Sequence, residues 1–289
     1  MYEIKKKKDG TELLIDLFYD ISSLYQYVST TDRRSTADES SDENDFYFTG
    51  TYSLNEAYKL LINGDEKLFN KIKDEHKKID IERIIGNISK RKKQEIDVVG
   101  YVPNIDNYLK GIPKNMYNQK NNSFNSKILN IVIDGSVSAG IDKDSIIRVG
   151  SLYSLIIDML EKKGYRCNLY MADMSYYNGN IYSMITRIKT DSERFNLKKM
   201  AFPMAHPSFF RRIGFKWIES CNIGFEPTHS GYGRPLGCEK TTDEIKKILE
   251  NELKMKLMLW RVQDDTKVSV TIENIIERLK ADGIVLTEE

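Results

Sequence analysis

The sequence has few of the residues that build disulfide frameworks and zinc sites. Only three cysteines occur in 289 residues, and no two of them lie within four positions of each other. This odd and scattered set argues against a disulfide framework and against a paired-cysteine zinc motif. The three histidines show no paired spacing, which argues against zinc catalysis. We therefore expect free thiols in a reducing, cytoplasmic compartment.

Long apolar runs are also absent from the sequence. The longest apolar stretches are about five to seven residues, whereas a helix that crosses a bilayer needs roughly 20. The lysine-rich start, Lys5–Lys8, is not followed by the apolar segment that a signal peptide requires. The sequence therefore predicts no membrane partner.

Neither sign of charge is in excess. The 44 Lys and Arg residues balance 43 Asp and Glu residues, and the formal net charge is +1. A protein that coats nucleic acid would carry a strong basic excess. The neutral total nevertheless conceals an acidic segment over 32–45 and basic segments over 66–95 and 191–216. Nucleic-acid binding through these basic segments is therefore an alternative function.

Residues 1–122 are predicted to form a smaller, mainly helical N-terminal part. The apolar spacing between Leu13 and Leu24 is helix-like, and Ser53 with Glu56 three residues later matches a helix capping box. We expect a domain boundary near residue 122, in a polar stretch. The predicted elements are a helix or arm over 11–30, an acidic loop over 31–45, helices over 53–63 and 66–85, and a turn-rich segment over 98–116.

Residues 123–289 are predicted to form an α/β domain with an open sheet and flanking helices. The β-branched run Ile128–Ile133 is typical of a buried parallel strand, and the apolar segment over 144–163 is typical of a helix packed on a sheet. Asn178-Gly179 indicates a hairpin turn. The other predicted strands lie over 166–174, 181–189, 255–262 and 284–286, and the other predicted helices over 191–201, 206–220, 242–253 and 271–281.

The loop between the first of these strands and its helix carries the most chemical information. It presents Asp134, Ser136 and Ser138 at the carboxyl end of a strand, where open α/β sheets bind ligands. One carboxylate and two hydroxyls are oxygen ligands that suit Mg²⁺. The same residue types also satisfy free backbone N–H groups at turns and helix starts. A metal site and a structural turn are both consistent with this loop.

Residues 127–289 resemble a von Willebrand factor A (vWA) domain. Asp134, Ser136 and Ser138 match the Asp-x-Ser-x-Ser motif of its metal-ion-dependent adhesion site, and the order of strands and helices after the motif is similar. The resemblance implies a vWA-like sheet, bound Mg²⁺, and protein–protein binding, for example as an adaptor for an AAA+ ATPase. It also implies that two other loops complete the site. The candidates are Thr228 or Thr190 for a threonine ligand and Asp264 or Asp265 for a second carboxylate.

The whole chain also resembles an uncharacterised family of phage and prophage proteins. This resemblance implies a viral protein in the cytoplasm of a host cell, or one associated with the virion. It implies a phage or host protein as partner, with a role in assembly, host takeover or counter-defence, and it leaves a homo-oligomer open. The segments that carry it are Gly100–Pro103, Gly111–Pro113, Ala201–Pro203, His206–Pro207 and Gly231–Pro235.

A Gly-rich loop after residue 222 is a candidate partner-binding surface. His229, Tyr232 and Arg234 give this loop the polar and aromatic mixture that is typical of contact surfaces. A long connection between structural elements could have the same composition. The loop is therefore consistent with either role.

Arg211 and Arg212 are a second pair of candidate contacts. They lie among aromatic residues, a mixture that can hold a protein partner or single-stranded nucleic acid. Phe209, Ile213 and Trp217 recur every fourth residue, however, as the residues on one helix face do, and this spacing favours packing in the core.

Ser138 also stands where the nucleophile of a serine hydrolase would stand. The chain order Ser138, Asp173, His206 matches that of an α/β-hydrolase, although Ser136 replaces the first glycine of the nucleophile elbow. A serine hydrolase is therefore a second alternative. The function predicted from the sequence is a non-enzymatic protein–protein interaction module.

Overall fold

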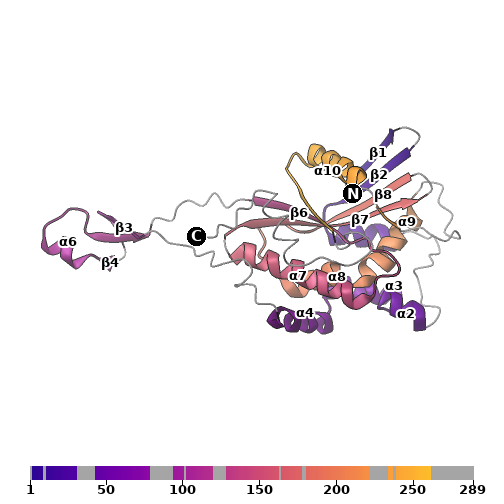
Figure 1. Cartoon of the computed structure of the whole chain (residues 1–289), viewed down its shortest axis with the longest axis horizontal. Coiled ribbons are helices and arrows are strands. Elements are labelled where there is room, and N and C mark those ends of the chain that lie inside the picture. The colour runs from indigo at the N-terminus through magenta and orange to yellow at the C-terminus, as the bar shows by residue number, and fades with distance from the viewer. Residues whose placement is uncertain are drawn as a thin grey trace.

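The computed structural model describes residues 2–8, 11–30, 43–78, 94–100, 102–119, 128–162, 164–177, 180–221, 234–236 and 239–261. Its main feature is a mixed sheet with helices on both faces (Figure 1). This arrangement confirms the predicted α/β class with an open sheet and flanking helices. No described helix combines the length and the apolar character needed to cross a membrane.

The described residues form a seven-stranded sheet, in which six strands follow the order β1-β2-β8-β7-β6-β10 and β9 pairs with β7. β10, β6 and β7 are parallel, β2 and β8 form a second parallel pair, and β7 is antiparallel to β8. The carboxyl ends of the β10-β6-β7 group and of the β2-β8 group therefore lie at opposite ends of the strands. The strands are β1 Tyr2–Lys8, β2 Thr11–Phe18, β6 Ile128–Asp134, β7 Arg166–Tyr177, β8 Asn180–Lys189, β9 Arg234–Pro235 and β10 Met258–Arg261.

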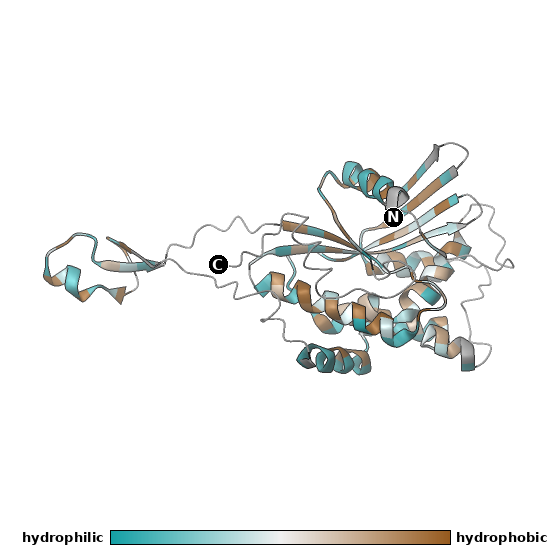
Figure 2. Ribbon diagram, viewed as in Figure 1, coloured by the Kyte–Doolittle hydropathy of each residue, from teal (hydrophilic) through white to brown (hydrophobic). Residues whose placement is uncertain are grey.

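Most of the helices cover one face of the sheet, and α10 covers the other (Figure 1). Figure 2 shows apolar residues along the strands and along α7, whereas α4 is mainly hydrophilic. The helices are α1 Ile21–Thr30, α2 Glu43–Thr49, α3 Leu54–Asn63, α4 Glu66–Lys78, α7 Lys143–Lys162, α8 Leu197–Ala205, a π-helical segment Phe209–Gly214, α9 Phe215–Ser220 and α10 Glu239–Leu253.

The strand and helix predicted on either side of the Asp134 loop are both confirmed. β6 is buried on both faces, because Ile131 and Ile133 enter one core and Val132 enters the other. α7 crosses α8 at Gly150, where a Cβ atom would lie 2.3 Å from the carbonyl oxygen of Met204. A glycine is therefore required at this crossing, since it lets the two helix backbones approach closely.

The predicted helix or arm over 11–30 is helical only over Ile21–Thr30, because residues 11–18 form strand β2. Leu14 and Phe18 enter the core on one face of the sheet, and Ile15 and Leu17 enter the core on the other. A strand that is buried on both faces has a continuous apolar run, which resembles a buried helix in the sequence. β2 pairs with β8, so the sheet includes strands from both sides of the boundary predicted near residue 122.

The N-cap half of the predicted capping box is observed at the start of α3, whereas the Glu56 carboxylate reaches one residue further back than predicted. The hydroxyl of Ser53 accepts a hydrogen bond from the backbone N–H of Glu56 at 3.2 Å, and Glu56 accepts one from Tyr52 N–H at 2.7 Å. Gly64, with φ of 81°, ends the helix as predicted. The predictions over residues 31–42, 79–93, 222–233 and 262–289 lie outside the described residues.

A second, three-stranded sheet lies apart from the main sheet in Figure 1. Its order is β3-β5-β4, and both pairings are antiparallel. We call residues 94–100 and 102–119 the β3–β5 unit. Its elements are β3 Gln94–Asp97, β4 Val102–Pro103, α6 Ile105–Leu109 and β5 Met116–Gln119. Only β4 and α6 lie within the segment over 98–116 that was predicted to be turn-rich, because β3 precedes it and β5 extends beyond it.

Candidate functional site

Asp134 is the last residue of β6, and only 1% of it is exposed. Its Oδ1 atom accepts hydrogen bonds from the backbone N–H of Ser136, at 3.1 Å, and from the Ser136 hydroxyl. The Ser136 hydroxyl also lies 3.0 Å from the carbonyl oxygen of Met174 on β7. Ser138 is half-buried, and its carbonyl oxygen accepts a hydrogen bond from Arg211. These bonds form a closed turn at the carboxyl end of the strand.

A cationic side chain that the sequence analysis missed stands next to this turn. Arg261 ends β10 and is paired in register with Asp134, and its Nε atom lies 3.5 Å from Asp134 Oδ2. Burial raises the pKa of Asp134, and the positive charge of Arg261 opposes that rise. The only signal for Arg261 in the sequence is its position directly after the apolar run Leu257–Trp260.

The oxygen atoms described at this turn are not arranged to coordinate a divalent cation. Oδ2 of Asp134 faces the guanidinium of Arg261, which would repel a cation bound to that oxygen, and Oδ1 is engaged by Ser136. Among the described residues, no group of three or more His, Cys, Asp or Glu side chains could hold a metal ion. Binding of Mg²⁺ by the whole chain stays a prediction.

Of the two threonines predicted as a further metal ligand, Thr190 does not lie beside Asp134. It follows Lys189, which pairs with Leu169 near the start of β7, whereas Asp134 pairs with Ala172 further along that strand. Thr190 therefore lies toward the opposite edge of the sheet. Thr228, Asp264, Asp265, His229 and Tyr232 lie outside the described residues, and of Arg234 the structure describes only the backbone, in β9.

Arg211 and Arg212 are buried, which corrects their assignment to a partner-binding surface. Arg211 donates to the carbonyl oxygens of Phe48, at 2.8 Å, and Ile141, at 2.7 Å, and burial lowers its pKa to about 10. Arg212 is 0% exposed. Both side chains are engaged inside the fold, as the core-packing interpretation of Phe209, Ile213 and Trp217 also requires.

The hydrogen bonds of His206 do not support a serine hydrolase. Its Nδ1 accepts from the backbone N–H of Ser208 at 3.1 Å, and its Nε2 lies 3.9 Å from Asp65. Burial lowers the pKa of His206 to about 4. Asp173 accepts a hydrogen bond from Ser175, at 2.8 Å. The ring nitrogens of His206 therefore face other groups than Ser138.

Two buried carboxyl groups share one face of the sheet, and the sequence analysis did not single them out as a pair. Asp16 on β2 and Asp173 on β7 both pair in register with Met184 on β8. Burial raises the pKa of Asp16 to about 6, although a 2.8 Å hydrogen bond from Trp217 Nε1 opposes the rise. Burial, with the negative charge of Asp134, raises the pKa of Asp173 to about 7. A lone acid within an apolar strand is the signal that could have identified them.

These raised pKa values predict that Asp173→Asn stabilises the protein at high pH. The carboxyl groups favour their neutral form in the fold, so their contribution is present below pH 3.8 and is lost as the pH rises toward about 7. At pH 8 we expect Asp173→Asn to be more stable than the wild type by about 4 kcal/mol, because the pKa rises from 3.8 to about 7 and each unit corresponds to about 1.4 kcal/mol. Near pH 4 the difference should vanish. Denaturant titrations across this range would measure it.

Comparing the variant with the wild type cancels the contributions of His76 and His206, whose pKa values are lowered by burial. Asp106→Asn, an exposed acid on α6, is the matched control and should show no such trend. A stability difference for Asp173→Asn that does not change with pH would contradict the prediction.

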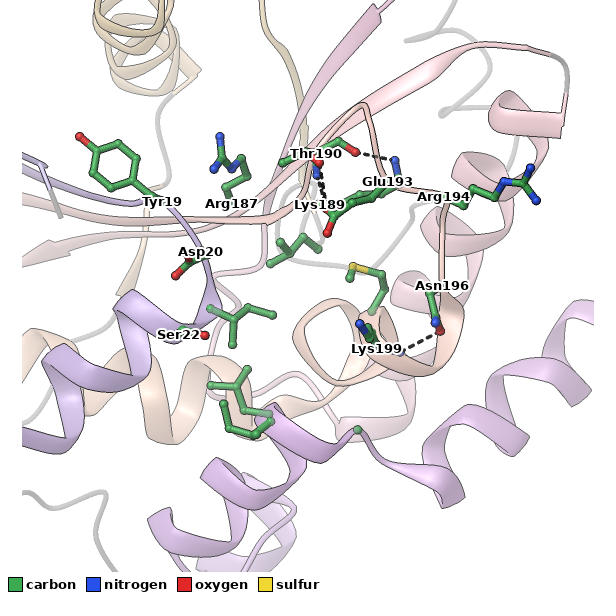
Figure 3. Close-up of a pocket in the computed structure, with 16 residues that line it drawn as sticks. Tyr19, Asp20, Ser22, Arg187, Lys189, Thr190, Glu193, Arg194, Asn196 and Lys199 are labelled. Atoms are coloured by element: carbon green, nitrogen blue, oxygen red, sulfur yellow. Dashed lines mark hydrogen bonds between the residues drawn. The ribbon is translucent and has the colours of Figure 1, made fainter.

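A hollow of about 680 Å³ lies where β2 and β8 end and α1 and α8 begin. Its charged lining does not converge on one point (Figure 3). Arg187 hydrogen-bonds Tyr170, with which it is paired, and Arg194 points away from the other labelled side chains. Glu193 accepts hydrogen bonds from Thr190. We therefore assign no ligand to this hollow.

The β3–β5 unit exposes an unusual amount of apolar surface. It contributes eight of the 15 large hydrophobic side chains that are exposed among the described residues. Leu109 is 77% exposed and Val99 is 71% exposed. The other six are Ile96, Val98, Val102, Ile105, Tyr108 and Ile112. Apolar groups that gather in one small unit indicate a contact surface.

Comparison with protein families places the chain in one of them. The model of the domain of unknown function DUF7192 matches residues 5–280. The chain belongs to the DUF7192 family. No curated protein and no solved structure matches it. The DUF7192 match begins in β1 and continues past β10, so the family includes both the main sheet and the β3–β5 unit.

Proposed function

We propose that this DUF7192 protein is a non-enzymatic protein–protein interaction module, and that its β3–β5 unit inserts into an apolar groove of a second protein. The observation that carries the proposal is the exposed apolar face of α6. Ile105, Tyr108 and Leu109 recur at positions i, i+3 and i+4, and each is at least 66% exposed. This spacing is typical of helices that dock into hydrophobic grooves.

The charge of the unit favours a protein over nucleic acid as the partner. Glu95, Asp97 and Asp106 nearly balance Lys110 and Lys114, so the unit has no basic excess that would attract phosphate. The hollow in Figure 3 is rimmed by charged groups and does not match an apolar helix, which favours a different protein over a second copy. The resemblances to vWA domains and phage proteins make a phage or host protein, such as an AAA+ ATPase, the first partner to test.

The test combines affinity capture with a titration of purified proteins. The full chain would be used to isolate partners from the producing cells, and the purified partner would then be titrated by calorimetry. We expect saturable binding that weakens at least tenfold in the double variant Tyr108→Ser/Leu109→Ser. Tyr176→Ser, which removes an exposed tyrosine from β7, is the matched control and should bind as the wild type does.

Light scattering distinguishes the competing occupants of this surface. A dimer of the chain that dissociates in the Tyr108→Ser/Leu109→Ser variant would assign the surface to a second copy and overturn the proposal. Equal binding of the partner by the wild type and the double variant would place the contact elsewhere. Circular dichroism of both variants would show that the fold is retained.

A further inference from the structure

The buried carboxylate of Asp134 needs a positive charge nearby. Taking an isolated carboxylate out of water is very costly unless a cation or several hydrogen-bond donors compensate its charge. Ser136 supplies two donors to Oδ1, but Oδ2 is buried and has no hydrogen-bond partner in the described part of the chain. A metal ion, a cationic side chain or a proton on the carboxyl group can compensate this second oxygen, and only a cationic side chain is found beside it in the described residues.

Arg261 is held in position to supply that charge. Its Nη2 atom donates to the carbonyl oxygen of Leu236, and its own carbonyl oxygen accepts a hydrogen bond from the hydroxyl of Tyr153 on α7. Tyr153 also stacks on Trp260, with ring centroids 5.2 Å apart. The side chain of Arg261 is thus held by Leu236, and its backbone is held by α7.

We propose that the guanidinium of Arg261 is the resident cation of the Asp134–Ser136 turn, and that the turn joins β10 to β6 through this ion pair instead of holding a divalent metal ion. The 3.5 Å between Arg261 Nε and Asp134 Oδ2 joins two buried atoms, neither of which has another hydrogen-bond partner in the described residues. The described part of the chain gives β10 four residues, and among the described strands it pairs with β6 alone, so a buried ion pair at Arg261 is well placed to fix its register.

The proposal separates this protein from the metal-dependent chemistry that its Asp-x-Ser-x-Ser motif implies. It goes beyond the proposed function, because binding through the β3–β5 unit does not depend on it. A partner that binds equally well with Mg²⁺ and with a chelator is consistent with both proposals. The tests of the two proposals use different residues, so one can fail while the other holds.

A double-mutant cycle tests the ion pair in the full chain. Arg261→Gln should lower the Tm by about 10 °C, because it leaves the Asp134 carboxylate buried without a counter-charge. Asp134→Asn/Arg261→Gln should be no less stable than Arg261→Gln alone. Arg148→Gln, an exposed arginine on α7, is the matched control and should leave the Tm unchanged. The fluorescence of Trp260, next to Arg261, would report the local change.

If Arg261→Gln does not fold, Arg261→Lys keeps the charge and should retain most of the Tm of the wild type. In parallel, millimolar Mg²⁺ should shift the Tm of the wild type no more than it shifts that of Asp134→Asn. Saturable Mg²⁺ binding that is lost in Asp134→Asn would overturn the proposal. Strictly additive effects of the two substitutions on the Tm would overturn it as well.

Discussion

Gly150→Ala is expected to lower the free energy of unfolding by about 3 kcal/mol or more, although alanine is the better helix former. The added Cβ would lie 2.3 Å from the carbonyl oxygen of Met204 and 2.6 Å from the Cβ of Ala205. Both atoms belong to α8, one to its backbone and the other to the Cβ of an alanine, so no rotation of a flexible side chain can relieve the contact. The two helices would have to separate, and overpacking of this kind typically costs 1–3 kcal/mol or more.

Intrinsic propensity opposes the clash but is too small to offset it. Alanine is favoured over glycine inside a helix by about 1 kcal/mol. Gly140→Ala is the matched control, because a Cβ at that position would meet nothing within 4 Å. Urea denaturation of both variants would measure the difference. A Gly150→Ala protein as stable as the Gly140→Ala protein would show that α7 and α8 can move apart at little cost.

Arg212→Met is expected to lower the free energy of unfolding by about 3–5 kcal/mol. Its Nε donates to the hydroxyl of Thr51 at 2.8 Å, and its Nη2 donates to the hydroxyl of Thr49 at 3.0 Å and to the carbonyl oxygen of Thr51 at 2.6 Å. Methionine fills much of the volume but donates no hydrogen bond. Buried acceptors that lose their donor pay the full cost of desolvation.

The substitution should destabilise the connection between α2 and α3 most, because Arg212 joins this connection to the π-helical segment. Thr51 also hydrogen-bonds Ser208, at 2.8 Å, so the network has a second point of attachment. Arg148→Met, on the exposed side of α7, is the matched control and should change stability by less than about 0.5 kcal/mol. Hydrogen exchange of residues 49–51 would locate the change. Equal stability of the two variants would contradict a structural role for Arg212.

Local patterns in the sequence determined those elements whose formation depends mainly on residues that are close in the chain. The β-branched run before Asp134, the apolar helix after it and the N-cap at Ser53 are all observed as predicted. The recurrence of Phe209, Ile213 and Trp217 was also enough to predict core packing, since each is fully buried. In each case the period of the apolar residues or the chemistry of a cap acts over a few positions.

Long-range pairing decided what the sequence left ambiguous or misleading. β2 resembled a helix because both of its faces are buried, and only its pairing with β8, more than 160 positions away, made it a strand. The two arginines at 211 and 212 resembled surface charge until their carbonyl and hydroxyl partners were known. Hydrophobic periodicity does not encode which distant backbone a buried polar side chain will meet.

The Asp134 loop shows the same division at the candidate site. The sequence by itself determined that a carboxylate and two hydroxyls follow a buried strand, which is the chemistry of a metal site or of a turn. The tertiary structure decided that Arg261, 127 positions later, faces that carboxylate. A parallel strand pair brings these residues into register, and electrostatic compensation in a buried site depends on which charges meet, not on their order in the chain.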